Sequence, residues 1–177
     1  MNNLKLIWSV RTVCGPEREK NEDAIYPNKS GNKMAPFRAA ICDGLGGHAK
    51  GEVASKIAAD SMRNEEDDLV KIIEDANYKI NNYQEKNIEA KGMGTTMTAL
   101  SINESGLMEV AHVGDSRCYV LSERNIIKLT EDQNVPGYKN VLKQALGTKE
   151  KLEIQKIDFQ LNRGDVVFLC TDGLYNE

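Results

Sequence analysis

The stretch RAAICDGLGGHAKGEVAS, residues 38–55, places an aspartate directly after an apolar run and follows it with glycines. The run ends at Asp43, and from Glu52 the apolar period changes from that of a strand to that of a helix. An Asp-Gly pair after a strand is usually a hairpin turn. Here a glycine loop and a helix follow Asp43 instead of a returning strand, so a simple turn fits this position poorly.

Other acids are placed in the same way. Apolar runs end at Asp115 in EVAHVGD and at Asp172 in VVFLCTDG, and the pair Glu22–Asp23 adjoins another strand-like segment. Carboxylates that share a pocket raise each other's pKa values unless cations neutralise them. A set of oxygen ligands suits Mg²⁺ or Mn²⁺. The pattern therefore indicates a candidate site for two such cations, where Gly44 has no Cβ to keep its carbonyl from a metal.

Ordinary structural roles account for parts of this pattern and stay open at this point. Strands on both sides of GDS make Asp115 consistent with a hairpin turn. The loop GLGGHAKG is compatible with a phosphate-binding helix start, although it lacks the GxxxxGK[ST] spacing. His48 fits a loop or helix-start residue better than a metal ligand, and His112 fits a packed strand residue.

Composition predicts one globular domain, residues 1–177, because the chain is long enough for a core and 40% of it is apolar. Charges of both signs are interspersed around a net charge of −4, so we expect no nucleic-acid or membrane partner. No signal peptide or membrane-spanning run is visible. The cysteines form no CxxC pair, which predicts free thiols and a cytoplasmic protein; they are Cys14, Cys42, Cys118 and Cys170.

The hydrophobic periodicity predicts an α+β fold. Strands are expected at 4–13, 35–42, 95–102, 107–113, 117–121, 125–129, 153–161 and 166–171, with a turn at 27–33. One amphipathic helix starts near Glu52 and a longer one covers residues 66–90. The turns NESG, GDS, SERN and NRGD suit antiparallel hairpins. The order of elements predicts helices packed on an antiparallel sheet or sandwich.

Seven motifs follow one another along residues 18–177: REKNEDA, AAICDGLGGHAKGEVAS, GMGTTMTAL, AHVGDSRCYV, LTEDQN, QALG and GDVVFLCTDGLYNE. In order and spacing they resemble the metal-dependent protein phosphatases of the 2C type, the PPM family, in their bacterial form. The resemblance implies an antiparallel β-sandwich flanked by helices, with two Mn²⁺ or Mg²⁺ ions at one end. It also implies hydrolysis of phosphoserine or phosphothreonine in proteins by a metal-bridging water, on the substrates of a Ser/Thr kinase.

The same resemblance implies roles for the acids at the strand ends. The position of Asp43 bridges both metals, and that of Gly44 gives a backbone carbonyl to the first. Asp172 matches a ligand of the second metal, and Asp115 matches one that helps bind a third, looser ion. The implied centre is therefore built almost wholly from the ends of three strands.

Three further residues complete the implied site. Glu22 and Asp23 match acids that order metal-bound waters, and Arg18 matches the arginine that grips the substrate phosphate. A guanidinium suits that task, since it pairs with two phosphate oxygens and keeps its charge. No CxxxxxR motif surrounds a cysteine, which disfavours a phosphocysteine mechanism.

The sequence departs from the family pattern at several points. Family members continue beyond TDGLYNE to a GxDN-type motif that supplies another metal ligand, so we expect a 2C-type fold without its last helices and strands. Uncovered sheet edges would favour self-association. The segment VPGYKNVLKQ is short where members carry a flap, and Leu45 stands where some have a histidine. Two alternative functions stay open: a weakly active or inactive module that binds phosphoprotein or a partner, and a nucleotide-binding domain. Glu177 is a candidate to replace the missing metal ligand.

Overall fold

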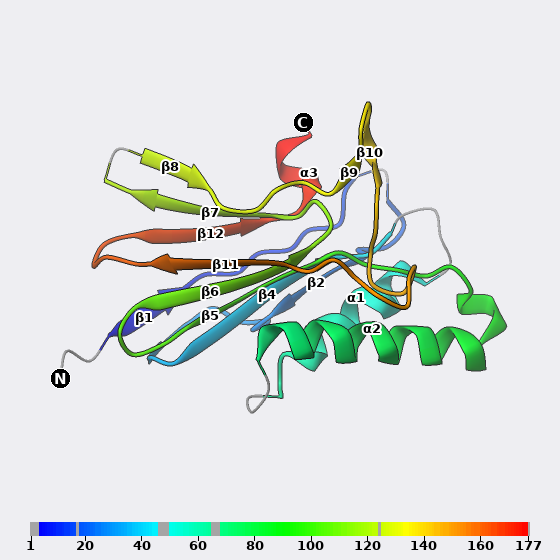
Figure 1. The fold of residues 1–177 in the computed structure, drawn as a ribbon, viewed down its shortest axis with the longest axis horizontal. Helices are drawn as coiled ribbons and strands as arrows, with labels where there is room; N and C mark the ends of the chain where they lie inside the picture. The colour runs from blue at the N-terminus through cyan, green and yellow to red at the C-terminus, as the bar shows by residue number, and fades with distance from the viewer. Residues whose placement is uncertain (1–3, 17, 46–49, 65–67, 124, 177) are drawn as a thin grey trace.

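Two antiparallel sheets face each other in the computed structural model, which describes residues 4–16, 18–45, 50–64, 68–123 and 125–176 (Figure 1). The larger sheet contains, in spatial order, β11 (Gln155–Gln160), β6 (Leu107–Val113), β5 (Met97–Ile102), β4 (Phe37–Asp43) and β2 (Asp23–Tyr26). The smaller sheet contains β12 (Val166–Cys170), β7 (Arg117–Ser122) and β8 (Asn125–Lys128). Two short pairs join β1 (Lys5–Trp8) to β3 (Gly31–Met34) and β9 (Asn134–Val135) to β10 (Tyr138–Leu142).

The space between the two sheets is filled by alternate residues of their inner faces, as in other β-sandwiches. Leu100 and Val110 of the larger sheet pack in one cluster with Cys118 and Val120 of the smaller sheet, and all four are buried. Strand β11 shows the regular alternation of a strand with one covered face. Strand β5 is buried on both faces because it lies at the centre of the larger sheet.

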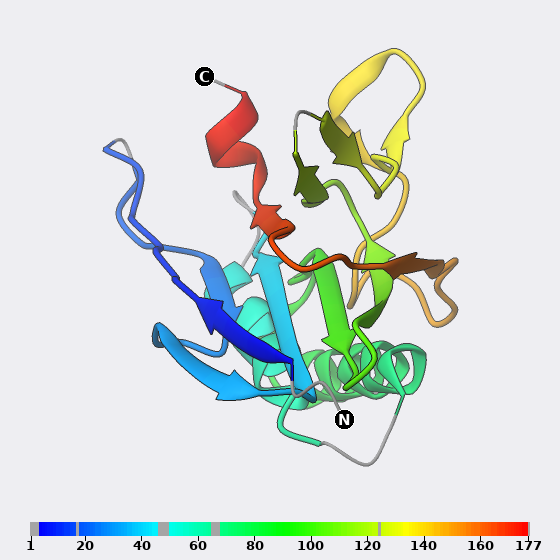
Figure 2. The same ribbon diagram turned by 90° about the vertical axis from the view of Figure 1, so that its left-hand side faces the viewer.

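Two helices cover the other face of the larger sheet (Figures 1 and 2). They are α1 (Gly51–Ser61) and α2 (Leu69–Lys86), and a 3₁₀ turn η1 (Ile88–Ala90) follows α2. The apolar stripe of α2 packs against buried residues of α1 and of the sheet, which places a second core on this side. The predicted long helix therefore exists but begins later, because the Asp68 side chain caps it by accepting from the backbone N–H of Lys71 at 2.9 Å.

Two of the predicted hairpins are wrong. The segments GDS (114–116) and NRGD (162–165) each carry the chain from the larger sheet to the smaller one, since β6 and β11 lie in the former and β7 and β12 in the latter. Gly114 and Gly164 take the positive φ angles of 111° and 99° that such sharp corners use. A hairpin and a corner between sheets need the same turn residues, so local sequence does not separate them.

The N-terminal segment also differs from the prediction. The expected strand at 4–13 pairs only over Lys5–Trp8, and its partner β3 occupies part of the expected turn at 27–33. Trp8 covers Gly31, where a Cβ would lie 2.7 Å from the indole ring. The indole N–H donates to the backbone oxygen of Lys29 at 2.8 Å, so Trp8 links β1 to the segment that leads into β3.

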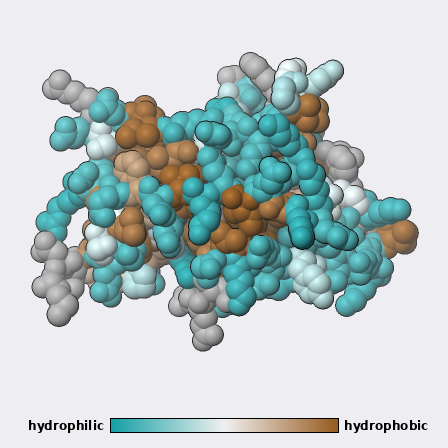
Figure 3. Space-filling view, viewed as in Figure 1, coloured by the Kyte–Doolittle hydropathy of each residue, from teal (hydrophilic) through white to brown (hydrophobic). Residues whose placement is uncertain are grey.

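The outer face of the smaller sheet is exposed and partly apolar. Among the described residues, helices α1 and α2 pack only on the larger sheet, so the expected flanking by helices is met on one side. Ile126 is 71% exposed and Val166 is 56% exposed, and both pair with Leu121 of β7. Phe168 is also exposed and lies two positions from Val166 along β12. Figure 3 shows apolar residues gathered over the strands of the sandwich. No helix in the described part of the chain is long and apolar enough to cross a membrane.

Candidate metal centre

Three of the predicted acids meet at one end of the sandwich. Asp23 of β2 and Asp43 of β4 are directly paired across the two strands, which puts their side chains on the same face. Asp172 follows β12 and begins the short helix α3 (Asp172–Tyr175). The hydroxyl of Thr171 donates to Asp23 Oδ2 at 3.1 Å, which ties this helix start to the larger sheet. The Asp43 carboxyl lies within hydrogen-bonding reach of Asp172.

The electrostatics of these acids are those of crowded carboxylates. Burial, together with the negative charges of Asp23, Asp172 and Asp115 in that order, raises the pKa of Asp43 to about 9. Burial also raises the pKa of Asp23, with the Thr171 hydroxyl opposing it and Asp172 adding to it. Each charged neighbour that bears on Asp43 therefore makes ionisation of this group harder, and a cation placed among the acids would reverse the effect.

Asp115 reaches the site because the corner between β6 and β7 brings it there. Burial raises the pKa of its carboxyl, while a hydrogen bond from Asn134 Nδ2 to Asp115 Oδ2 at 3.2 Å opposes the shift. The Tyr175 hydroxyl donates to the backbone oxygen of Asp115 at 2.9 Å. Helix α3, which carries Asp172, is thus joined directly to the loop that carries Asp115.

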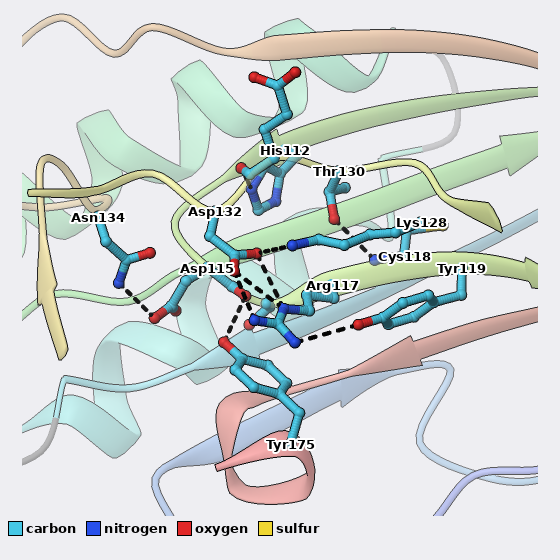
Figure 4. A network of polar contacts seen from close by, with 12 residues as sticks. His112, Asp115, Arg117, Cys118, Tyr119, Lys128, Thr130, Asp132, Asn134 and Tyr175 are labelled. Carbon is cyan, nitrogen blue, oxygen red and sulfur yellow. Dashed lines mark hydrogen bonds and ion pairs between the residues drawn. The ribbon is translucent and has the colours of Figure 1, made fainter. Parts of the chain in front are cut away.

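A cationic side chain supports this junction from the side (Figure 4). Arg117 makes a bidentate pair with Asp132, with Nε–Oδ1 at 3.0 Å and Nη2–Oδ2 at 2.7 Å, and Lys128 contacts the same carboxylate at 2.6 Å. The guanidinium carbon lies 3.3 Å from the centre of the Tyr175 ring, so a cation–π contact holds α3 in place. Hydrogen bonding to Asp132 raises the pKa of Arg117, which keeps its charge.

Glu22 and Gly44 pack against the start of α1. A Cβ on Gly44 would lie 2.5 Å from the Gly51 oxygen and 2.7 Å from the Glu22 oxygen, so backbone crowding itself requires glycine here. The Gly44 N–H donates to the Glu22 oxygen at 3.1 Å. Burial raises the pKa of Glu22, and the nearby positive charge of Arg18 lowers it. The predicted arginine therefore lies close to Glu22, and it is exposed.

The remaining sequence-based expectations have mixed outcomes. His112 is a fully buried residue of β6, as predicted. The cysteines are free; Cys42, Cys118 and Cys170 are buried and Cys14 is partly exposed. His48 and Glu177 lie outside the described residues. Leu45 donates its backbone N–H to the Gly94 oxygen at 2.9 Å.

The donor set fits a hard divalent cation. The described residues contain no ready cluster of three or more His, Cys, Asp or Glu side chains in the close arrangement of a metal site. The acids that surround Asp43 nevertheless offer only oxygen donors, and their mutual repulsion is the kind that Mg²⁺ or Mn²⁺ relieves.

Several supporting residues were not predicted from the sequence. Thr171, Asn134 and Tyr175 all contact a predicted acid or its backbone. Each lies inside or beside a motif already recognised, LTEDQN or GDVVFLCTDGLYNE, so the motifs marked the region. The motifs did not show which acid each of these residues contacts, since the contacted acids lie 19 to 148 positions away in sequence.

The family is shown by comparison with known proteins. The Protein phosphatase 2C family matches residues 17–177, and the chain belongs to this family. The serine/threonine phosphatase stp of Listeria monocytogenes is 31% identical over 198 residues, covering 94% of this chain and 77% of the relative. The serine/threonine protein phosphatase PstP of Mycobacterium tuberculosis is 30% identical, covering 97% of this chain and 37% of the relative.

Solved structures confirm the predicted fold. The Mycobacterium tuberculosis phosphatase PstP/Ppp superposes with a TM-score of 0.78 at 26% identity, over 97% of this chain and 79% of that one. Stp1 from Staphylococcus aureus superposes with a TM-score of 0.78 at 29% identity, over 99% of this chain and 77% of that one. The sandwich is therefore the fold of bacterial serine/threonine phosphatases.

Proposed function

We propose that this chain hydrolyses phosphoserine and phosphothreonine in proteins. The observation that carries the proposal is the meeting of Asp23, Asp43 and Asp172 at one end of a 2C-type sandwich. The names of the relatives, which are serine/threonine phosphatases, support the same reaction. We expect its substrates to be phosphoproteins made by a Ser/Thr kinase, and we expect the protein itself in the cytoplasm.

The acids and one carbonyl would hold the metal ions. Asp43 and the Gly44 carbonyl are assigned to the first ion, Asp43 and Asp172 to the second, and Asp115 to a looser third. Mn²⁺ or Mg²⁺ bound there would supply an activated water and neutralise charge that develops on the phosphoryl group. Strand pairing with Asp23 fixes the position of Asp43, and the bond from the Tyr175 hydroxyl to the Asp115 backbone joins the elements that carry Asp172 and Asp115.

The three remaining site residues would act on the water and on the substrate. Glu22 and Asp23 would accept hydrogen bonds from waters of the centre and so orient them. Arg18 would bind phosphate oxygens through its planar fork. Its side chain is exposed and lies beside Glu22, so a phosphoprotein can reach it without rearrangement of the core.

A cysteine nucleophile is disfavoured by the environment of the thiols. Burial raises the pKa of Cys42, which lies beside Asp43, and it raises the pKa of Cys118 to about 12. A thiol of this kind stays protonated near neutral pH, whereas a nucleophilic cysteine must be a thiolate. These two thiols are therefore unsuited to form a covalent phosphoenzyme, which agrees with the proposed attack by water.

The test is hydrolysis of a phosphothreonine peptide across a Mn²⁺ titration. Asp43→Ala and EDTA-treated protein should lose turnover. Asp60→Ala is the matched control, because Asp60 is an exposed acid of α1 paired with Lys56 and Arg63 and should keep the wild-type rate. Full turnover in Asp43→Ala would overturn the proposal. Folded protein that binds the phosphopeptide without hydrolysing it would favour the alternative of a phosphoprotein-binding module.

We also propose that two copies associate through the smaller sheet. Ile126 and Val166 are more than half exposed there, and the edge strands β8 and β12 offer unpaired backbone groups. Light scattering across a concentration series should show a dimer that Ile126→Lys weakens. A monomer at all concentrations would exclude this association while leaving the proposed reaction untouched.

A further inference from the structure

Two threonines of the motif GMGTTMTAL lie beside the candidate centre, where they contact the backbone of Asp43. Thr95 and Thr96 precede β5 and are 0% and 1% exposed. Their hydroxyls and backbone groups contact the peptide groups on either side of Asp43. Buried hydroxyls are retained in proteins where they satisfy specific polar partners.

The backbone of Asp43 is held by this threonine pair on both sides. Its N–H donates to Thr96 Oγ1 at 3.0 Å. Its backbone oxygen accepts from the Thr96 N–H at 2.9 Å and from the Thr95 hydroxyl at 2.9 Å. The strand end that carries this acid is thus fixed by groups that belong to the neighbouring strand segment.

Thr96 also reaches the second acidic element. Its hydroxyl lies 2.8 Å from Ser116 Oγ, in a fully buried contact. Ser116 directly follows Asp115 in the corner between the sheets. A Cβ on Gly114 would lie 2.6 Å from the Thr96 methyl group, so the corner is packed directly against this threonine. One side chain therefore contacts the backbone of Asp43 and the loop of Asp115.

We propose that Thr96 is a positioning residue that holds Asp43 and Asp115 at a fixed separation through its bonds to the Asp43 amide and the Ser116 hydroxyl. This inference rests on the proposed metal centre, because it concerns how the acids of that centre are arranged. Residues that orient metal ligands typically change metal affinity by 10- to 100-fold when they are altered. Thr96 acts on the ligands through the backbone and a second hydroxyl rather than by touching the ions.

The experiment measures Mn²⁺ binding by calorimetry, with thermal unfolding of the metal-free protein alongside. Thr96→Val keeps the shape and removes the hydroxyl, and we expect it to weaken Mn²⁺ binding about tenfold. Thr96→Ser restores the oxygen and should recover binding to within about threefold of wild type. Thr130→Val is the matched control, since the buried Thr130 hydroxyl accepts from the Cys118 N–H at 3.0 Å in the same way.

Thr130→Val should lower the unfolding temperature while leaving Mn²⁺ affinity within about twofold of wild type. Equal Mn²⁺ affinities in Thr96→Val and Thr130→Val would overturn the positioning role. If Thr96→Val does not fold, Ser116→Ala is the deciding variant. It removes the hydrogen bond between the Thr96 and Ser116 hydroxyls and leaves the bond from the Asp43 N–H to Thr96 intact. Unchanged Mn²⁺ affinity in Ser116→Ala would also overturn the inference. Asp43→Ala tests the proposed metal centre separately from the role of Thr96. Retained Mn²⁺ binding in this variant would disprove the centre itself.

Discussion

Asp23 and Asp43 lie directly opposite each other on β2 and β4, at the end of the sandwich where Asp172 begins α3. Strand pairing thus forces two half-buried carboxylates together, and the pKa of each is raised, chiefly by burial. Such an arrangement weakens the fold in the absence of a cation and is typical of sites kept for function.

The first prediction is that Asp43→Asn stabilises the metal-free protein. Asp43 has a pKa raised to about 9 in the folded protein, so at pH 8 it must bind a proton on folding, and asparagine avoids that cost; we expect a gain of at least about 1 kcal/mol in the free energy of unfolding at pH 8. Urea unfolding of chelator-treated protein measures it. The same variant should lose the stabilisation that Mn²⁺ gives to wild type.

Asp165→Asn is the contrasting control for that prediction. Asp165 accepts from the Asn162 N–H at 2.8 Å in an exposed turn, and this bond lowers its pKa. Loss of its charge should therefore not stabilise the protein. Equal effects of the two substitutions would show that Asp43 is not under electrostatic strain.

The second prediction concerns Arg18, whose exposed guanidinium lies near Glu22. Arg18→Ala should raise KM for a phosphothreonine peptide about tenfold, because a charge-assisted bidentate pair contributes more than about 1.4 kcal/mol to phosphate binding. The kcat should change much less. Steady-state kinetics with saturating Mn²⁺ separates the two constants.

Lys20→Ala is the matched control for Arg18, since it removes another positive charge from the same segment. Lys20 forms an exposed ion pair with Glu52 at 3.3 Å, and such pairs contribute little. Its KM should stay near the wild-type value. An equal rise of KM in both variants would point to a general charge effect in place of a specific phosphate contact.

Much of this molecule was predictable from local patterns. Most of the strands, the two long helices and the nearness of the acids followed from periodicity and from the order of seven motifs, whereas β3, the β9–β10 pair and the short helix α3 were not predicted. The corner at Asp115 did not, because a turn between strands looks the same whether it stays in one sheet or crosses to the other. That difference depends on which strands pair, and pairing is decided by burial across the whole sandwich.

The supporting contacts were hidden for a related reason. Thr171 meets Asp23 across 148 positions of sequence, and Thr96 meets Ser116 across 20. Hydroxyl residues are common in strands and turns, so their type alone carries little information. Only the fold shows which of them face the acids.

The third prediction uses His112, whose pKa burial lowers to about 4. Its Nε2–H donates to the Glu131 oxygen at 3.1 Å, so in the neutral ring Nδ1 accepts from the Thr98 hydroxyl at 2.8 Å. The unfolded chain binds a proton between about pH 6.5 and pH 4 that the folded chain does not, so stability falls as pH falls through this range.

Comparison with His112→Asn isolates this contribution. The stability advantage of wild type over the variant should shrink by on the order of 3 kcal/mol between pH 7 and pH 4. Urea unfolding at both pH values gives the two differences, and carboxylates that titrate in both proteins cancel. Parallel pH profiles would mean that His112 is not held neutral by the fold.

The fourth prediction concerns the junction of Arg117, Asp132 and Tyr175. Lysine at position 117 keeps the charge but cannot form the bidentate pair or lie flat over the Tyr175 ring. Arg117→Lys should therefore destabilise the protein by about 1–2 kcal/mol. Because Tyr175 joins α3 to the Asp115 backbone, Mn²⁺ affinity should also fall.

Lys56→Ala is the control for this prediction, because it breaks an exposed ion pair. It should cost at most about 0.5 kcal/mol in the free energy of unfolding and leave Mn²⁺ affinity unchanged. A stability loss in Arg117→Lys without weaker Mn²⁺ binding would show that this junction supports the sandwich but not the position of Asp115.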